Sequence, residues 1–212
     1  MQITERDRAI LLALTHKVRL LSLHQIARTW WNETESGLTN TRKRLSLLAT
    51  GPAPLIRKLQ VNAHPELNLV EPLFIWSPGE PAPHFGALSY RLKSRWTEAP
   101  KPTTVYIATQ TAVRQFGGWG GKLKRPLQVT HDLHLSQIYL LYLKHRPLEV
   151  EHWMSEESIA LDRLRQKLPD AELRDSQGNT TLVIEFAGAY DAQHVKRVHE
   201  DCLKRSLPYE LW

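Results

Sequence analysis

Residues 36–49, SGLTNTRKRLSLLA, decide the fold of the N-terminal half of the chain. Four of their side chains recur at the spacing of one helical face: Leu38, Thr41, Leu45 and Leu48. The basic run Arg42–Arg44 stands between them, and the following Gly51 and Pro52 are typical of the end of a helix. The pattern predicts an amphipathic helix from about Ser36 to Ala49.

Two shorter helices are predicted before this one. Thr4, with Asp7 three residues later, resembles a capping box, and the apolar residues that follow predict an amphipathic helix over 5–16. Ser22, with Gln25 three residues later, repeats the start signal and predicts a second, short helix.

Strand-like segments accompany the helices of this half. The expected strands are 54–61, 69–76 and 103–108. Three short helices followed by such strands match a winged helix-turn-helix, which is an α+β fold. Further helices are expected over 83–96 and 109–116.

The third helix of a winged helix-turn-helix normally lies in the major groove of DNA. Short polar and basic side chains can then reach base edges, while Lys and Arg hold phosphates. The candidate DNA-binding residues on this helix and on the wing are Asn40, Arg42, Lys43, Arg44, Arg57 and Lys58. Two alternatives stay open: the basic run is a solvated helix face, or the domain is a protein-protein module.

The charge is divided unevenly along the 212 residues, whose net charge is +6. Residues 1–128 hold 18 Lys and Arg against 8 Asp and Glu, whereas residues 129–212 hold 10 against 14. Such asymmetry is typical of a nucleic-acid-binding module joined to a different domain, although a basic solvated face also produces it.

A glycine-rich basic segment, GGWGGKLKRP, spans residues 117–126. Glycine makes such a segment flexible, and its cations suit a phosphate backbone: Lys122, Lys124 and Arg125. We therefore expect a winged-helix domain over 1–116, a linker over 117–128 and a second domain over 129–212.

The composition excludes several classes of protein. Hydrophobic residues make up 42% and charged residues 24% of the chain, as in ordinary globular proteins. No apolar run approaches the roughly 20 residues of a membrane-spanning helix, and the N-terminus does not resemble a signal peptide. A single cysteine, Cys202, excludes an intrachain disulfide and a multi-cysteine zinc site. These features predict a cytoplasmic protein without a membrane partner.

The C-terminal half alternates helices and strands. The expected helices are 131–145, 156–167 and 191–205, and the expected strands are 149–154, 170–174, 181–187 and 207–212. This alternation predicts an α/β layer around a small mixed sheet.

Two carboxylates of this half are candidates for chemistry. Asp170 opens one expected strand, and Glu185 lies inside the next, on the same face as Val183 and Ala187. Carboxylates that converge from adjacent strands would form a hard-oxygen site for Mg²⁺ or Mn²⁺. The alternative is a buried or edge glutamate paired with an Arg or His.

A histidine pair offers a less specific metal site. His131 and His134 are three residues apart on an expected helix and could share a face as metal ligands. Such pairs without a third ligand are more often surface or core polar residues.

The whole chain resembles the replication-relaxation proteins of bacterial plasmids and mobile elements. These proteins combine a winged helix with a nuclease-like domain. The stretches that carry the resemblance are TERDRAILLAL at 4–14, VYIATQTA at 105–112, His131-Asp132-Leu133, Trp153-Met154-Ser155-Glu156, Pro169-Asp170, and VIEF at 183–186 with Glu185.

The C-terminal half is similar to the restriction-endonuclease-like PD-(D/E)XK fold, with the order helix, strand, strand, strand, helix, strand. This resemblance implies that Asp170 and Glu185 are metal ligands and that a catalytic lysine stands two residues after the glutamate. That position is Ala187, and Lys196 on the following helix would have to substitute. Glu156 could supply a further carboxylate.

Three functional hypotheses follow. The first is a DNA-binding protein that controls replication, mobilisation or transcription of a plasmid or other mobile element. Its nuclease-like domain would then be degenerate and serve homodimerisation or the docking of other mobile-element proteins. The second is a metal-dependent DNA endonuclease that uses Asp170 and Glu185, and the third is a protein-interaction adaptor.

Overall fold

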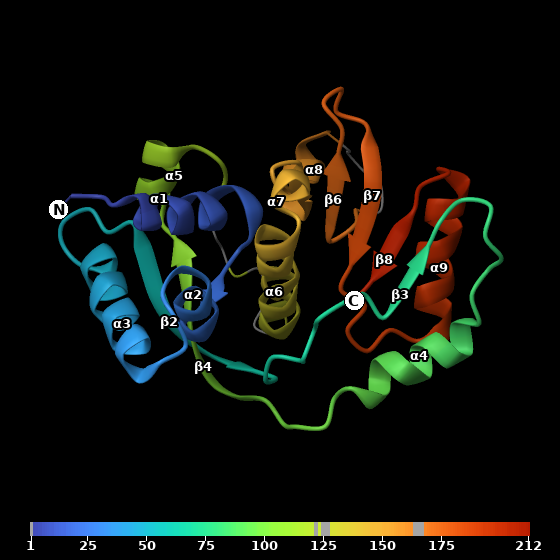
Figure 1. The fold of residues 1–212 in the computed structure, drawn as a ribbon, viewed down its shortest axis with the longest axis horizontal. Helices are drawn as coiled ribbons and strands as arrows, with labels where there is room; N and C mark the ends of the chain where they lie inside the picture. Colours follow the sequence, from blue (N-terminus) through green and yellow to red (C-terminus); the bar gives the residue numbers. More distant parts are fainter. Residues whose placement is uncertain (1, 121–122, 124–127, 163–167) are drawn as a thin grey trace. The chain divides into compact units, whose positions relative to one another are not determined.

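The computed structural model describes residues 2–120, 123, 128–162 and 168–212 (Figure 1). The chain is a mixed α+β protein that divides into two compact units. Unit 1 comprises Met1–Pro65 and Pro100–Leu140, and unit 2 comprises Glu66–Ala99 and Leu141–Trp212. No helix among the described residues is both long and apolar enough to cross a bilayer.

The two units are interleaved along the chain, unlike the sequential domains expected from the sequence. Residues 66–99, expected in the first domain, belong to unit 2. Residues 129–140, expected in the second domain, belong to unit 1. The correction has two physical causes, a strand that pairs outside unit 1 and a helix that begins in the core of unit 1.

The helices of unit 1 begin where the capping signals predict. Thr4 and Asp7 form a capping box at α1 (Glu5–Leu12), which continues into the π-helical turn η1 (Ala13–Lys17). Ser22 and Gln25 form another at α2 (Leu23–Trp30), directly after strand β1 (Leu21–Ser22). The third helix, α3, spans Glu35–Ala49, and α5 spans Gln110–Phe116.

The start of α3 requires a glycine. The Thr34 hydroxyl caps the helix by accepting a hydrogen bond from the Gly37 N–H at 3.1 Å. A Cβ atom on Gly37 would lie 2.4 Å from the backbone oxygen of Asn32, which is closer than van der Waals contact allows. The absence of a side chain at Gly37 therefore lets the turn between α2 and α3 close.

Unit 1 contains a three-stranded antiparallel sheet in the order β1-β4-β2. Strands β2 (Ile56–Ala63) and β4 (Lys101–Ala108) pair along their whole length. The expected strand over 69–76 is wrong in extent and in the domain to which it belongs. Only Phe74–Trp76 is a strand, β3, and it pairs with β8 (Tyr209–Leu211) in unit 2.

The first part of α6 (Val129–His145) is anchored in the core of unit 1. Val129 and Leu133 pack in one apolar cluster with residues of β2 and β4. Asp132 forms a buried ion pair with Arg19 at 2.8 Å, and the Gln25 amide donates to the Leu133 carbonyl at 2.7 Å. These contacts place residues 129–140 in unit 1.

Unit 2 contains a five-stranded sheet in the order β3-β8-β7-β6-β5. Strands β7 (Thr180–Glu185) and β8 run parallel, and the other pairs, including those of β6 (Ala171–Arg174) and β5 (Trp153–Ser155), are antiparallel. The expected strand over 149–154 is wrong in its first half. The short helix α7 (Pro147–Val150) takes its place, because Pro147 is suited to the first turn of a helix.

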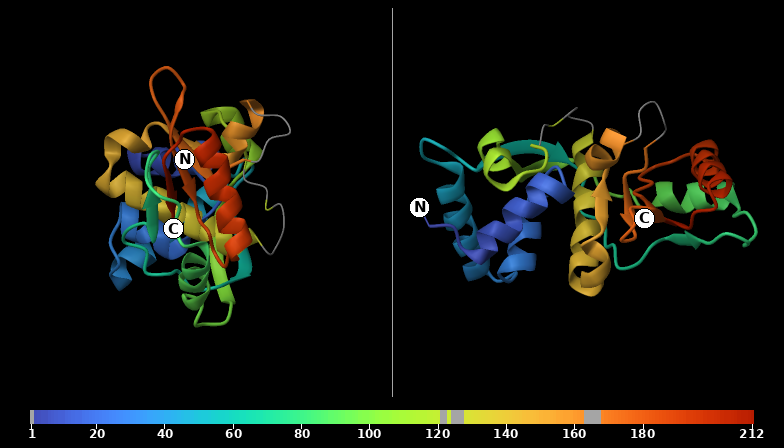
Figure 2. Two further views of the ribbon diagram at one scale, coloured as in Figure 1. Left: turned by 90° about the vertical axis from the view of Figure 1, so that its right-hand side faces the viewer. Right: turned by 90° about the horizontal axis from the view of Figure 1, so that it is seen from above.

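Two helices of unit 2, α4 (Phe85–Ser94) and α9 (Ala192–Lys204), pack against each other (Figure 2). Their apolar residues form one buried cluster with side chains of β3, β7 and β8. The further helix α8 spans Glu156–Asp162, and the rest of the helix expected over 156–167 lies outside the described residues.

Candidate functional site

Helix α3 presents a polar and basic surface on unit 1. Thr41, Leu45 and Leu48 are buried, which fixes the helix against the core, whereas Asn40, Arg42 and Lys43 are exposed. The predicted separation of an apolar and a polar face is therefore confirmed.

Arg44 does not belong to this surface. Its Nε donates to Asp7 Oδ1 at 2.8 Å, and its terminal nitrogen donates to the other Asp7 oxygen and to the Gln2 carbonyl. Burial opposes ionisation of Asp7, but hydrogen bonds from Arg44 and Thr4 outweigh it and hold the pKa of the Asp7 carboxyl below its usual value. The Arg44 guanidinium therefore joins α3 to α1, and its expected role in DNA binding stays a prediction.

The two basic residues at the start of β2 lie on opposite faces of the sheet. Lys58 pairs across the strands with Tyr106, so the two side chains share a face. Burial raises the pKa of the Tyr106 hydroxyl, and the positive charge of Arg42 opposes that rise. Arg57 pairs with the core residue Ile107 and so lies on the other face.

Arg57 and Lys58 do not stand at the connection between the paired strands β2 and β4. Both residues stand near the α3 end of β2, whereas the connection from β2 to β4 leaves from the far end at Ala63 and carries residues into unit 2. We define the α3 surface as Asn40, Arg42, Lys43 and Lys58. The expected linker cations Lys122, Lys124 and Arg125 lie outside the described residues.

In unit 2, the structure brings Asp170 and Glu185 together. Ala171 pairs with Ile184, so the preceding Asp170 lies beside Glu185 on the neighbouring strand. Asp170 Oδ2 accepts a hydrogen bond from the Phe186 N–H at 2.8 Å, and Glu185 is 3% exposed. Glu185 shares its face with Val183 and Ala187, as predicted, because both belong to the cluster under α4 and α9.

Tyr190 lies beside these two carboxylates, and the sequence did not predict this position. Its hydroxyl donates to Glu185 Oε2 at 3.2 Å. Burial raises the pKa of Tyr190, and the negative charges of Glu185 and Asp170 raise it further, so the three groups are neighbours. The tyrosine is held from its other side, because its ring stacks on His194 with centroids 3.8 Å apart. The only signal in the sequence is its place directly before Asp191, the N-cap of α9.

The lysine expected near the carboxylates is not brought to them. Lys196 lies on the exposed side of α9, where its ammonium is 3.6 Å from Glu200 of the same helix. Ala187, at the position that the resemblance assigns to a lysine, is fully buried in the apolar cluster. The apolar cluster thus occupies the position of the expected lysine, and the catalytic role of Lys196 stays a prediction.

The other expected metal ligands do not complete a site. The backbone N–H of Glu156 donates to the Asp170 carbonyl at 3.2 Å, so Glu156 follows the strand next to Asp170. His134 Nδ1 lies 2.6 Å from the Thr130 carbonyl, and His131 lies 3.5 Å from Asp132. Across the residues that the structure describes, no three His, Cys, Asp or Glu side chains form a group that could hold a metal ion.

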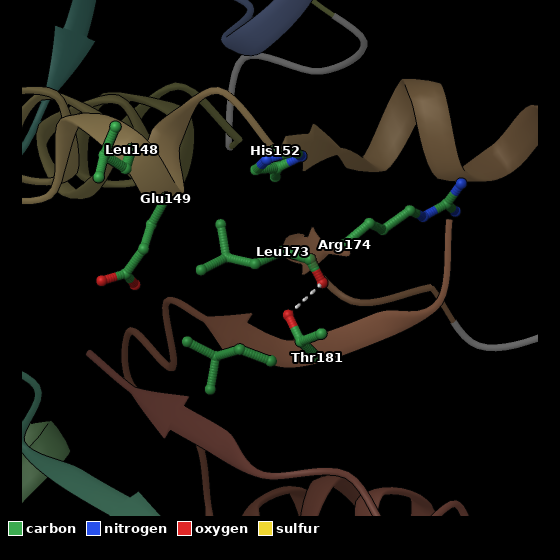
Figure 3. Close-up of a pocket in the computed structure, with 7 residues that line it drawn as sticks. Leu148, Glu149, His152, Leu173, Arg174 and Thr181 are labelled. Carbon is green, nitrogen blue, oxygen red and sulfur yellow. Dashed lines mark hydrogen bonds between the residues drawn. The ribbon is translucent and has the colours of Figure 1, made fainter. Parts of the chain in front are cut away.

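The opposite face of the unit 2 sheet carries a pocket of about 540 Å³ (Figure 3). It is lined by Leu148, Glu149, His152, Leu173, Arg174, Thr181 and Leu182. Leu173 pairs with Leu182, and the alternation of side chains places both on the face away from Asp170 and Glu185. This pocket is therefore separate from the carboxylate pair.

A buried glutamate on this same face was also missed. Glu210 on β8 accepts hydrogen bonds from the Tyr142 hydroxyl at 2.7 Å and from the Trp212 indole at 2.8 Å, and Arg146 lies 3.3 Å from it. Its three partners satisfy the carboxylate, and they tie residues 142–146 to the sheet.

No family model, curated protein or solved structure matches this chain. The resemblance to replication-relaxation proteins stays a prediction.

Proposed function

We propose that the protein binds duplex DNA through the α3 surface. The observation that carries the proposal is the exposed set Asn40, Arg42 and Lys43 on a helix whose opposite side is fixed in the core. Asn and Arg are suited to base edges and Lys to phosphates. Lys58 adds an exposed cation on β2, the strand that follows α3 in the chain.

The order of elements supports a winged helix-turn-helix in unit 1. Helix α1, strand β1, helices α2 and α3 and strands β2 and β4 follow one another, and the sheet order is β1-β4-β2. In such a domain α3 is the helix that enters the major groove. The connection between β2 and β4 departs from a simple wing, because it supplies β3 and α4 to unit 2.

The process that this DNA binding serves is proposed from the resemblance alone, as the control of replication, mobilisation or transcription of a mobile element. Unit 2 would then be a nuclease-like scaffold without cleavage activity. The buried Ala187 and the outward position of Lys196 support that interpretation.

Fluorescence anisotropy with a labelled duplex tests the proposal. Arg42→Ala/Lys43→Ala should weaken binding, and the loss of the Lys43 phosphate contact should reduce the slope of log K against log salt by about 0.9. A matched control is Arg114→Ala/Lys144→Ala, which removes the same charge from two other exposed positions. Equal binding by the α3 variant and the wild type would overturn the proposal and favour a protein-interaction adaptor.

A metal-dependent endonuclease is the second candidate, favoured by the adjacent Asp170 and Glu185. Two carboxylates with water ligands are a donor set that Mg²⁺ or Mn²⁺ accepts, and these two residues would hold the ion. A bound divalent cation would supply a Lewis acid for phosphodiester hydrolysis. In the present arrangement the Phe186 N–H and the Tyr190 hydroxyl bind these carboxylates and fix their orientation.

Nicking of supercoiled DNA separates the two candidates. Cleavage with Mg²⁺ or Mn²⁺ that EDTA stops, and that Asp170→Asn and Glu185→Gln abolish, would establish the endonuclease. Intact but retarded DNA under the same conditions supports a DNA-binding protein without cleavage.

A further inference from the structure

Helix α4 of unit 2 displays an aromatic side chain to solvent. Tyr90 is 76% exposed, although tyrosine rings are usually packed at least in part. Its neighbours one turn away on the helix are small or basic: Gly86, Ala87, Lys93 and Ser94. All four are exposed, so no bulky side chain of α4 covers the ring of Tyr90.

Two basic residues follow Tyr90 on α4, and one of them, Lys93, lies one helical turn away. Arg91 and Lys93 are both exposed, and α4 contains no Asp or Glu. Neither cation forms an ion pair within the part of the chain that the structure describes. Burial lowers the pKa of the nearby Arg95 to about 10, and repulsion from Arg91 contributes to the shift. The exposed side of α4 is therefore a site of unneutralised positive charge.

The helix that carries these residues is firmly held. Leu88 and Leu92 are buried in the cluster shared with α9, and the Ser89 hydroxyl donates to the Tyr190 carbonyl at 3.0 Å. A ring on such a helix is pre-organised, so a ligand that stacks on it orders few additional groups.

We infer that α4 binds single-stranded nucleic acid, with a base stacked on Tyr90 and phosphates held by Arg91 and Lys93. An exposed aromatic ring among cations is the combination that single-strand binding uses, because every unpaired base offers a π-face and every nucleotide a negative charge. A duplex buries those base faces in its own stack. The charge is complementary to a polyanion, and the single ring with small neighbours offers little apolar area to a protein partner.

This surface is distinct from the α3 surface and extends the proposed function. A protein that binds duplex DNA with unit 1 and a single strand with unit 2 would be suited to DNA that is partly opened. The two activities are carried by different residues, so each can be tested without the other.

The test is fluorescence anisotropy of the full chain with labelled (dT)15 in low salt. Tyr90→Leu, which keeps an apolar side chain but removes the ring, should weaken binding about tenfold or more. Tyr90→Phe keeps the ring and should bind like the wild type. Arg91→Ala/Lys93→Ala should also weaken binding and lower its salt dependence, whereas the charge-matched Arg114→Ala/Lys144→Ala should not. Circular dichroism melting establishes that each variant is folded.

The single-strand measurement tests the residues of α4, and the duplex measurement tests the α3 surface, so the two results are independent. Loss of (dT)15 binding in Tyr90→Leu with unchanged duplex binding supports the inference, even if the α3 variant shows that the proposed function is wrong. The inference is overturned if the wild type does not bind (dT)15, or binds anionic lipid vesicles instead. It is also overturned if single-strand binding depends on Arg42 and Lys43 but not on Tyr90.

Discussion

The ion pair between Arg44 and Asp7 predicts that a residue of the basic run is structural. The Asp7 side chain is fully buried, and Arg44, whose side chain is 22% exposed, supplies two donors to it. Substituting Arg44→Met keeps most of the aliphatic packing and leaves the carboxylate with Thr4 as its remaining partner. Removing one partner of a buried pair costs about 3–5 kcal/mol, and because Arg44 is partly exposed we expect about 2–3 kcal/mol.

Urea unfolding at pH 7 measures this loss in the free energy of unfolding. The pKa of Asp7 is lowered from 3.8, so the stabilisation from its ionised form is complete above that value. It is lost only as the pH falls through the lowered pKa. A double-mutant cycle with Asp7→Asn isolates the pair, and Arg42→Ala is the matched control because Arg42 is exposed on the same helix. The reasoning would be refuted if Arg44→Met left stability unchanged and weakened duplex binding as much as Arg42→Ala.

Three further predictions concern stability. His199 is buried against Trp76 and within 3.1 Å of the Tyr209 hydroxyl, and burial lowers its pKa. The contribution of the neutral His199 to the free energy of unfolding should therefore be fully present above pH 6.5 and be lost as the pH falls below it. His199→Gln should reduce this pH dependence in urea unfolding. An unchanged dependence would contradict the lowered pKa of His199. Gly37→Ala should lower the melting temperature, because its Cβ would lie 2.4 Å from a backbone oxygen, and an unchanged melting curve would argue against that contact. Ala187→Lys should destabilise unit 2 rather than restore cleavage, since position 187 is fully buried; a stable variant that nicks DNA with Mg²⁺ would show the opposite.

The local parts of the fold could be predicted from the sequence. The helices α1, α2 and α3 begin within one residue of their predicted starts, because a capping residue and the helical period act over a few neighbours. The pairing of β3 with β8 could not be predicted. Phe74–Trp76 and Tyr209–Leu211 are far apart in the sequence, and nothing local to Phe74–Trp76 specifies its partner. The placement of residues 66–99 in unit 2 follows from that pairing.

The residues of the candidate site could likewise be predicted only where neighbouring positions in the sequence decide the geometry. Asp170 and Glu185 could be identified because strand order and alternation place them together. Arg44 and Lys196 were assigned from their residue types, whereas the structure pairs Arg44 with Asp7 of another helix and Lys196 with Glu200 on its own helix. Cations in a run look alike in sequence, and only the fold distinguishes a paired one from an exposed one.

Photocrosslinking from α3 to duplex DNA tests the central claim most directly. Cys202 is buried, so a cysteine introduced at the exposed Ser46 can be labelled selectively with a photoreactive group; Gln115→Cys on α5 is the control. The α3 surface predicts crosslinks from position 46 that unlabelled duplex and added salt suppress, and few from position 115. Crosslinks from position 115 with none from position 46 would contradict DNA binding by α3.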